Sequence, residues 1–250
     1  MRWFDQQVDE AIMRVKEIPK YLSFLKEYRA FSEMSNKAGR GPLKREDRYP
    51  CMNDRTKGTG FDPHYLYHVA WAARVLARTR PEKHIDISSS LNFCTTVSAF
   101  VPIEFYDYRP AQLKLDGLSS SHADLMALPF EDGSVNSLSC MHVVEHIGLG
   151  RYGDAYDPNG DIKAIDELKR VLAPGGDLLF VSPLGAPRVM FNAHRIYSYD
   201  QVMELFSDLR LMEFSLITDD QTGEGAILNA SKELSDRQRY GCGCFWFKKK

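Results

Sequence analysis

The sequence HIDISSSLNF, His84 to Phe93, is the starting point for predicting the fold. Its first five residues read as a short apolar strand with an acidic residue, Asp86, near its end. A polar turn follows, in which Ser88, Ser90 and Asn92 occupy positions where many nucleotide-binding folds carry glycines. The stretch is therefore either a cofactor loop whose glycines are replaced or a loop that has lost its cofactor.

Short apolar strands alternate with helices along the rest of the chain. Further strands are predicted at 103–108, 134–144 and 177–185, and helices at 93–101, 160–176 and 198–209. This alternation is typical of a largely parallel sheet covered by helices on both faces. Residues 209–217 and 241–249 look like a closing pair of strands and predict an antiparallel edge. The predicted fold class is α/β, with ligands bound beyond the carboxyl ends of the strands.

The first part of the chain has a different pattern. Residues 1 to about 36 look helical, with an interruption at Pro19, and residues 37–61 form a long polar connection. A helix is expected to begin with Asp62 as its N-cap and Pro63 in its first turn, and to end near Thr79. We therefore expect a helical cap and lid segment over residues 1–79 and an α/β domain over residues 80–250.

Composition excludes several classes of protein. The chain has 250 residues, of which 44% are hydrophobic and 26% charged, and its formal net charge is −2. This balance gives no reason to expect a nucleic acid or an anionic membrane as partner. No apolar run is long enough for membrane insertion, and the charged N-terminus does not resemble a signal peptide. Five scattered cysteines favour reduced thiols and a cytoplasmic location.

Two further motifs carry a family resemblance. The segments HADLMALPFEDGSVNSLSCMHVVEHI (122–147) and ELKRVLAPGGDLLFVSP (167–183) resemble the class I S-adenosylmethionine-dependent methyltransferases. That likeness implies a Rossmann-like methyltransferase fold for residues 80–250. The segments SLSCMHVVEHIGLGRYGD (137–154) and FNAHRIYS (191–198) are similar to an uncharacterised bacterial family often found among surface-polysaccharide genes.

The resemblance implies roles for particular residues. Asp86 would organise the loop under the methionine part of S-adenosylmethionine. Asp107 would accept hydrogen bonds from the ribose hydroxyls, a charge-assisted arrangement that favours a carboxylate. Asp124 would accept from the adenine amino group, beside the backbone of Leu125. The implied cofactor-binding residues are Asp86, Ser88, Ser90, Asn92, Asp107, Asp124, Leu125 and His142.

The serine-substituted loop leaves cofactor binding open. Glycine accepts a positive φ and lets the backbone approach a ligand closely. Asn92 tolerates the left-handed region, whereas Ser88 and Ser90 adopt it at a cost of roughly 1 kcal/mol each. Their hydroxyls could instead donate to the cofactor carboxylate, while their β-carbons partly block close approach.

Polar residues after the predicted strands suggest an acceptor site. Methyl transfer to a hydroxyl requires a base near neutral pKa, and His146 and His194 are the candidates. The predicted substrate-binding residues are His64, Tyr65, Glu145, Arg151 and Arg195. His146 could instead stabilise its loop, and both arginines could pin their loops to nearby backbone.

No metal site is predicted. The sequence HVVEH (142–146) matches a zinc hydrolase signature, but that signature requires a helix, which is not expected here. His64 and His68 are spaced for one helix face. Packing is the better explanation for His68, whereas His64, near the end of the loop, is open to either explanation. Cys242 and Cys244 are explained as alternate residues of one strand.

The leading hypothesis is a methyltransferase that uses S-adenosylmethionine to O-methylate a saccharide or small polar acceptor. The alternative is a non-catalytic or repurposed methyltransferase fold that binds a nucleotide-sugar or a partner enzyme in polysaccharide biosynthesis. An open cleft beside Asp107 and Asp124 would favour the enzyme. The segment from Asp54 to His68 is expected to close over the cleft, with Thr59, Phe61, Asp62, His64 or Tyr65 facing it. The alternative is that the helix from Asp62 covers one face of the sheet and the loop before it is solvated. The sequence does not predict an oligomeric state.

Overall fold

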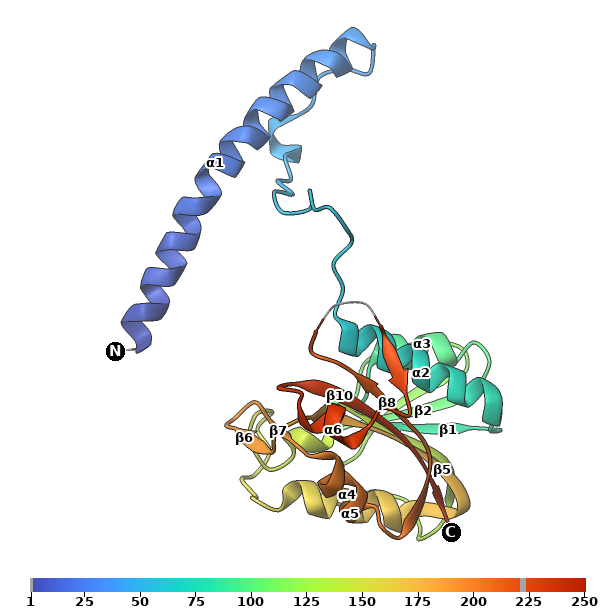
Figure 1. Ribbon diagram of the computed structural model, residues 1–250. Helices are drawn as coiled ribbons and strands as arrows, with labels where there is room; N and C mark the ends of the chain where they lie inside the picture. The colour runs from blue at the N-terminus through green and yellow to red at the C-terminus, as the bar shows by residue number, and fades with distance from the viewer. Residues whose placement is uncertain (1, 221–223) are drawn as a thin grey trace. The chain divides into compact units, whose positions relative to one another are not determined.

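The computed structural model describes residues 2–220 and 224–250, with side chains from residue 17 onward. The chain divides into two compact units, residues 1–60 and 61–250. Figure 1 labels most of the elements, which are α1 (Arg2–Lys37), η1 (Arg45–Asp47), α2 (Pro63–Thr79), β1 (His84–Ile87), α3 (Leu91–Val97), β2 (Ile103–Asp107), β3 (Leu118–His122), β4 (Val135–Met141), η2 (Val144–His146), α4 (Gly160–Val171), β5 (Leu172–Leu184), β6 (Arg188–Met190), β7 (His194–Ile196), α5 (Tyr199–Leu205), β8 (Leu209–Ile217), β9 (Ala226–Leu228), α6 (Lys232–Asp236) and β10 (Gly241–Lys249).

The smaller unit consists of the helix α1 and the segment that follows it. Pro19 lies inside α1, so the predicted interruption is wrong, because a proline removes one backbone hydrogen bond without ending the helix here. The Arg55 guanidinium makes two hydrogen bonds to the Glu27 carboxylate, of 2.9 and 2.6 Å. The Tyr28 hydroxyl donates to the Leu43 carbonyl at 2.9 Å. These contacts hold the connecting segment against the helix.

The larger unit is built on one eight-stranded sheet with the order β3-β2-β1-β4-β5-β10-β8-β9. The first five of these strands are parallel, whereas β10 is antiparallel to both β5 and β8. The predicted antiparallel closing pair is confirmed. The strand order reverses between β1 and β4, since the chain proceeds from β1 to β2 and β3 on one side and returns to place β4 on the other.

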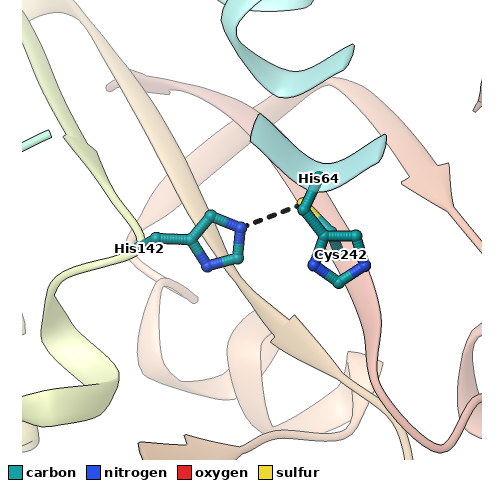
Figure 2. A group of neighbouring side chains, drawn as sticks. All are labelled: His64, His142 and Cys242. Atoms are coloured by element: carbon teal, nitrogen blue, oxygen red, sulfur yellow. Dashed lines mark hydrogen bonds between the residues drawn. The ribbon is translucent and has the colours of Figure 1, made fainter. Parts of the chain in front are cut away.

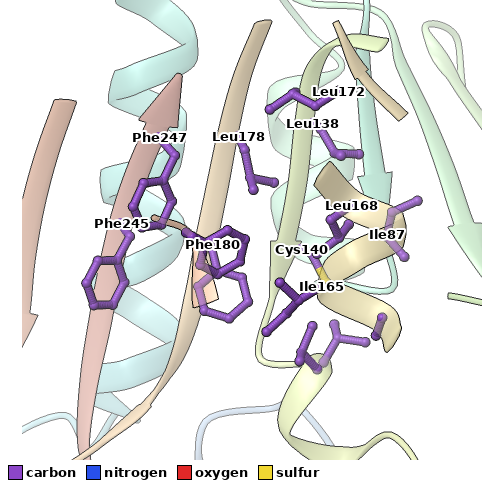
Figure 3. Packing of buried hydrophobic residues seen from close by; sticks show 14 of the residues in the cluster. Ile87, Leu138, Cys140, Ile165, Leu168, Leu172, Leu178, Phe180, Phe245 and Phe247 are labelled. Atoms are coloured by element: carbon purple, nitrogen blue, oxygen red, sulfur yellow. The ribbon is translucent and has the colours of Figure 1, made fainter. Parts of the chain in front are cut away.

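Two apolar cores cover the two faces of the sheet. Successive residues of β5 alternate between them: Leu178 and Phe180 face the core with α4 and α5, while Leu179 faces the core with α2 and α3. Figure 3 shows the first core, in which Phe180 packs among Ile165, Leu168 and the phenylalanines of β10. The result is a three-layer arrangement of the larger unit, with α4 and α5 on one face of the sheet and α2 and α3 on the other (Figure 1).

Helix α2 begins as predicted and belongs to the larger unit. The Asp62 side chain accepts hydrogen bonds from the backbone N–H groups of His64 and Tyr65, and Pro63 occupies the first turn. Trp71 Nε1 donates to Glu213 Oε1 at 2.8 Å, which anchors the helix to β8. The boundary between the two compact units lies before α2. The predicted organisation into a cap and lid over residues 1–79 and a domain over residues 80–250 stays a prediction. A lid function of the segment before α2 also stays a prediction.

Some elements differ from those predicted. Helix α4 ends at Val171 and the strand begins at Leu172, earlier than expected, because Pro174 favours an extended backbone at the residue before it. Strand β3 was missed, because its sequence LSSSH is polar and mostly exposed. The short elements β6, β7, β9 and α6 were also missed. No helix in the described part of the chain is long and apolar enough to span a membrane.

Candidate functional site

The candidate site lies at the carboxyl ends of the parallel strands, where the strand order reverses. The serine loop follows β1, Asp107 ends β2, Asp124 follows β3, and His142 follows β4. Two adjoining cavities open at this edge, one of about 400 Å³ and one of about 450 Å³. We call them the carboxylate cavity and the histidine cavity.

The serine loop is held by internal hydrogen bonds. Ser88 has a positive φ of 54°, which a glycine would adopt without strain, and both its N–H and its hydroxyl donate to the Tyr106 carbonyl. The Ser89 hydroxyl accepts from the Met141 N–H at 3.0 Å. Ser90 is the residue before α3, and the exposed Asn92 lies in its first turn. Of the three predicted loop residues, only Ser88 lines a cavity.

Asp86 lies under this loop and is completely buried. Its carboxylate accepts hydrogen bonds from the Ser89 N–H, at 3.1 Å, and from the Ser139 hydroxyl. Burial raises the pKa of Asp86 to about 6, although these hydrogen bonds oppose the shift. Asp86 is therefore hydrogen-bonded to the loop and lines neither cavity, and its predicted role beneath a cofactor stays a prediction.

The carboxylate cavity contains four of the predicted cofactor residues besides Ser88, which are Asp107, Asp124, Leu125 and His142. Asp107 Oδ1 accepts from the Arg109 N–H at 2.7 Å, and Asp124 Oδ1 accepts from the Met126 N–H at 2.9 Å. Among the described residues each acid thus uses one oxygen locally, which leaves Oδ2 available to a ligand. Both acids are fixed by their own turns and face one open space.

The histidine cavity is lined mainly by polar and aromatic side chains. It contains the predicted residues Tyr65, Ser88, His142, Glu145, His146, Arg151 and His194, together with Tyr152, Ala193 and Tyr240. Four residues line both cavities: Ser88, His142, His146 and Tyr152. The two cavities therefore share a wall, so that molecules bound in each would meet at these four residues.

His146 is placed to accept a proton. Its Nδ1 donates to the Ala193 carbonyl at 2.6 Å, which leaves Nε2 without a proton in the neutral ring. Arg151 donates to the same carbonyl at 3.1 Å. Burial lowers the pKa of His146, and the nearby Glu145 opposes that shift. His146 is therefore neutral at pH 7.

The second predicted base, His194, begins β7. Its ring lies 4.8 Å from the ring of Tyr240 and 6.3 Å from that of His146. Its Nε2 is buried and has no hydrogen-bond partner in the described part of the chain. Burial lowers the pKa of His194. Both candidate bases thus lie along one wall of the histidine cavity.

His142 is engaged by two neighbours in a backbone conformation with a φ of 58°. Its Nδ1 lies 3.0 Å from Glu145 Oε1, and its Nε2 lies 3.3 Å from the sulfur of Cys242. Burial lowers the pKa of His142 to about 4 and raises that of Glu145 to about 7. Figure 2 shows the His142 and Cys242 contact beside His64. The HVVEH segment forms a 3₁₀ turn at Val144–His146, and its two histidines do not share an α-helix.

The loop after η2 is held in shape by Asp154 and Arg195. Asp154 accepts from three backbone N–H groups, those of Gly148, Gly150 and Tyr152. Gly148 has a φ of 78°, and a Cβ atom there would lie 2.1 Å from the Asp157 carbonyl oxygen. This arrangement presents Tyr152 to both cavities, stacked under the Arg109 and Arg151 guanidinium groups.

Arg195 lies outside both cavities and is 6% exposed. Its guanidinium donates to the carbonyls of Ile147 and Pro158 at 2.7 and 3.3 Å, and its Nε lies 3.4 Å from Asp161 Oδ2. Arg195 is thus hydrogen-bonded to the backbone of its surroundings. This is the arrangement expected if the arginines stabilise their loops and do not bind an acceptor. Arg151, in contrast, lines the histidine cavity.

Helix α2 brings further residues to the site. Tyr65 lines the histidine cavity, whereas His64 lines a neighbouring hollow with Phe61 and Asp62. Thr59 lies in the smaller unit, and its predicted place in the cleft stays a prediction. Sequence reasoning missed Tyr240, because β10 runs antiparallel and so brings its beginning, not its end, to this edge of the sheet.

One protein family matches part of the chain. A family model described as a Caenorhabditis protein of unknown function, DUF268, matches residues 129–237. No curated protein matches the chain. The segment matched by the family model includes Glu145, His146, Arg151, His194 and Arg195 but not the three predicted cofactor acids.

Solved structures of methyltransferases match most of the chain. One is the N-methyltransferase NodS from Bradyrhizobium japonicum WM9 with S-adenosyl-L-homocysteine, which is 14% identical, with 80% of this chain and 91% of that chain covered and a TM-score of 0.52. Another is the 1,6-didemethyltoxoflavin-N1-methyltransferase from Burkholderia thailandensis with its acceptor and S-adenosylhomocysteine, at 8% identity, 73% and 78% coverage and a TM-score of 0.51. The predicted Rossmann-like methyltransferase fold is confirmed.

Proposed function

We propose that the protein transfers a methyl group from S-adenosylmethionine to a hydroxyl of a small polar acceptor. The observation that carries the proposal is the shared wall of the two cavities, formed by Ser88, His142, His146 and Tyr152. A group-transfer enzyme must bring its donor and its acceptor together at one point. Cavities that adjoin at a candidate base meet that requirement.

The carboxylate cavity suits the adenosyl part of the cofactor. Asp107 and Asp124 stand at the ends of neighbouring strands, and each keeps one carboxylate oxygen for a ligand. Carboxylates form strong hydrogen bonds to paired hydroxyls and to amino groups. S-adenosylhomocysteine in the two methyltransferase structures supports the same class of ligand. When bound, S-adenosylmethionine supplies an electrophilic methyl group.

The histidine cavity suits an acceptor that forms many hydrogen bonds. His146 would accept the proton of the reacting hydroxyl at Nε2, because its Nδ1 is already used by the Ala193 carbonyl. Tyr65, Tyr152 and Tyr240 offer flat apolar faces beside polar edges. Arg151 would balance negative charge on the acceptor. This mixture favours a saccharide, including an acidic one, whereas the two methyltransferases above act on nitrogen by their names.

Titration with S-adenosylhomocysteine by calorimetry tests the cofactor half of the proposal. We expect saturable binding that Asp107→Asn or Asp124→Asn weakens by roughly 10- to 100-fold, the range for a lost hydrogen bond to a charged group. Asp116→Asn is the control, because Asp116 is exposed and lines neither cavity. If the unmodified protein binds no S-adenosylhomocysteine at millimolar concentration, the proposal fails.

A second candidate function is a binding module for a nucleotide-sugar or for an enzyme of polysaccharide assembly. The observation that favours it is the serine loop, whose N–H and hydroxyl groups are used by Tyr106 and Met141 rather than offered to a ligand. Calorimetric titration also distinguishes the two candidate functions. Binding of a uridine diphosphate sugar without binding of S-adenosylhomocysteine would favour the module.

A further inference from the structure

Three metal-binding side chains from distant parts of the chain lie together beside the histidine cavity. They are His64 from α2, His142 after β4 and Cys242 from β10. One ligand atom from each lies within 4.8 Å of the other two. Figure 2 shows the three side chains, with the hydrogen-bond contact between His142 and the Cys242 sulfur. The two imidazole rings are nearly parallel, with 4° between their planes and 5.8 Å between their centres.

The distances suit a small divalent ion. Zinc bonds of about 2.0–2.1 Å to nitrogen and 2.3 Å to sulfur, at tetrahedral angles, place the two ligand atoms roughly 3.5 Å apart. His142 Nε2 lies 3.3 Å from Cys242 Sγ. The remaining separations, up to 4.8 Å, close through small rotations of the His64 side chain.

Glu145 gives His142 the orientation of a metal ligand. Its Oε1 lies 3.0 Å from His142 Nδ1, and both side chains are buried. The carboxylate fixes the proton on Nδ1, so the lone pair of Nε2 faces the thiol. A carboxylate behind a histidine is the usual outer partner in zinc sites, where it sets the tautomer and raises ligand basicity.

We propose that His64, His142 and Cys242 bind a zinc ion. Thiolate and imidazole together favour zinc over magnesium or calcium, which take oxygen ligands. On binding, the Cys242 thiol loses its proton to solvent and its sulfur bonds to the metal, while the two imidazoles bind as neutral rings. This site adjoins the proposed methyl-transfer site, because His142 also lines both cavities. The proposal goes beyond methyl transfer, and zinc binding is measured without S-adenosylmethionine.

Three protein ligands leave a fourth tetrahedral position, which in zinc enzymes holds water or substrate. His68 lies beside the cluster, with its ring 5.2 Å from that of His142. Its Nδ1 donates to the His64 carbonyl at 2.6 Å, and its buried Nε2 has no partner among the described residues. Nε2 is therefore an unused acceptor, which a metal-bound water could satisfy.

The test measures metal binding directly. Purified protein is stripped of metal with a chelator and dialysed against Zn²⁺, and the zinc content of the protein is then measured by mass spectrometry. A second stripped sample is titrated with Co²⁺ and followed by absorption spectroscopy. We expect one zinc per chain, and a thiolate-to-cobalt charge-transfer band with d–d bands of tetrahedral intensity. Cys242→Ser should remove the charge-transfer band, and His64→Ala should weaken zinc binding at least 100-fold.

Matched variants separate the ligands from their surroundings. Cys140→Ser is the thiol control, because Cys140 is equally buried and lies outside the cluster. His122→Ala is the histidine control, because His122 is exposed. Glu145→Gln tests the positioning residue and should weaken zinc binding by 10- to 100-fold while leaving the cobalt band in place. Circular dichroism establishes that each variant is folded.

Two results would overturn the proposal. One is less than a tenth of a zinc per chain after dialysis, with no cobalt band, in protein that is folded. The other is rapid alkylation of Cys242 by iodoacetamide in the presence of saturating zinc, since a metal-bound sulfur is protected. The second result would show that the Cys242 thiol is accessible to the reagent and holds no metal.

Discussion

His146 Nε2 lies 3.8 Å from Glu145 Oε1, and the Glu145 side chain is only 1% exposed. The two residues are adjacent in sequence, yet the 3₁₀ turn directs both side chains toward the histidine cavity. An ionised Glu145 favours a proton on His146, whereas burial disfavours it. The pair therefore influences the pH at which His146 loses its proton.

Replacing His146 with asparagine tests that role. Asparagine keeps a donor near the Ala193 carbonyl but has no basic nitrogen, so we expect kcat to fall by roughly 10²- to 10⁴-fold with little change in melting temperature. In the unmodified protein, kcat should rise with pH and reach half its maximum below pH 6.5, since burial lowers the pKa of His146. Unchanged turnover in His146→Asn would exclude His146 as the base, and His122→Asn is the control.

Replacing Tyr65 with alanine tests whether α2 covers the acceptor. Tyr65 lines the histidine cavity and is 53% exposed, so its loss should raise the acceptor KM roughly 10-fold and leave the melting temperature nearly unchanged. The control is Leu66→Ala, on the same helix at 48% exposure but outside that cavity. A fall in melting temperature without a change in KM would make Tyr65 structural.

The stability of the fold should depend on pH through Asp86. Burial holds its pKa at about 6, above its unfolded value of 3.8, so the native state binds this proton more strongly than the unfolded chain does. The resulting stabilisation is complete below about pH 4 and is lost as the pH rises through 6. The difference in free energy of unfolding between the unmodified protein and Asp86→Asn should therefore move in favour of the variant by about 2 kcal/mol from pH 4 to pH 7. Urea unfolding at several pH values measures it, and a constant difference would contradict the buried position of Asp86.

Arg195 and Arg151 should respond differently to the same substitution. Arg195→Met breaks a buried contact with Asp161 and leaves backbone carbonyls without donors, so we expect a loss of about 3 kcal/mol in the free energy of unfolding. Arg151→Met should raise the KM for an anionic acceptor and change stability by less than about 1 kcal/mol. Thermal melting measures the change in stability, and steady-state kinetics measure the change in KM. A higher KM without a lower melting temperature in Arg195→Met would indicate that Arg195 binds the acceptor.

Much of the fold could be predicted because its signals are local. Asp62 and Pro63 mark the start of α2 by the chemistry of a helix N-terminus. The buried strands show continuous apolar runs, whereas β3 is a polar edge strand without that pattern. The extent of β5 was misjudged because the glycines after Pro174 resemble the end of a helix and not a strand.

The site could be predicted only in part. Asp107, Asp124, His142 and His146 follow neighbouring parallel strands, and one rule brings all of them to a single edge of the sheet. Cys242 and Tyr240 reach the same edge through an antiparallel strand, for which that rule does not hold. The role of Arg195 depends on which backbone carbonyls lie beside it, such as that of Ile147. Those carbonyls are distant in sequence, so no local sequence pattern predicts the contact.

The position of β10 constrains the order in which the larger unit can fold. β10 lies between β5 and β8, although β8 and β9 precede it along the chain. During synthesis β8 and β9 therefore emerge before β10, the strand that joins them to the sheet. Until β10 is made, the pair of β8 and β9 has no hydrogen-bonded connection to the rest of the sheet. Closure of the sheet and assembly of the His64, His142 and Cys242 cluster become one late event, so a ribosome that stalls before β10 would expose an open sheet edge, a ready template for aggregation.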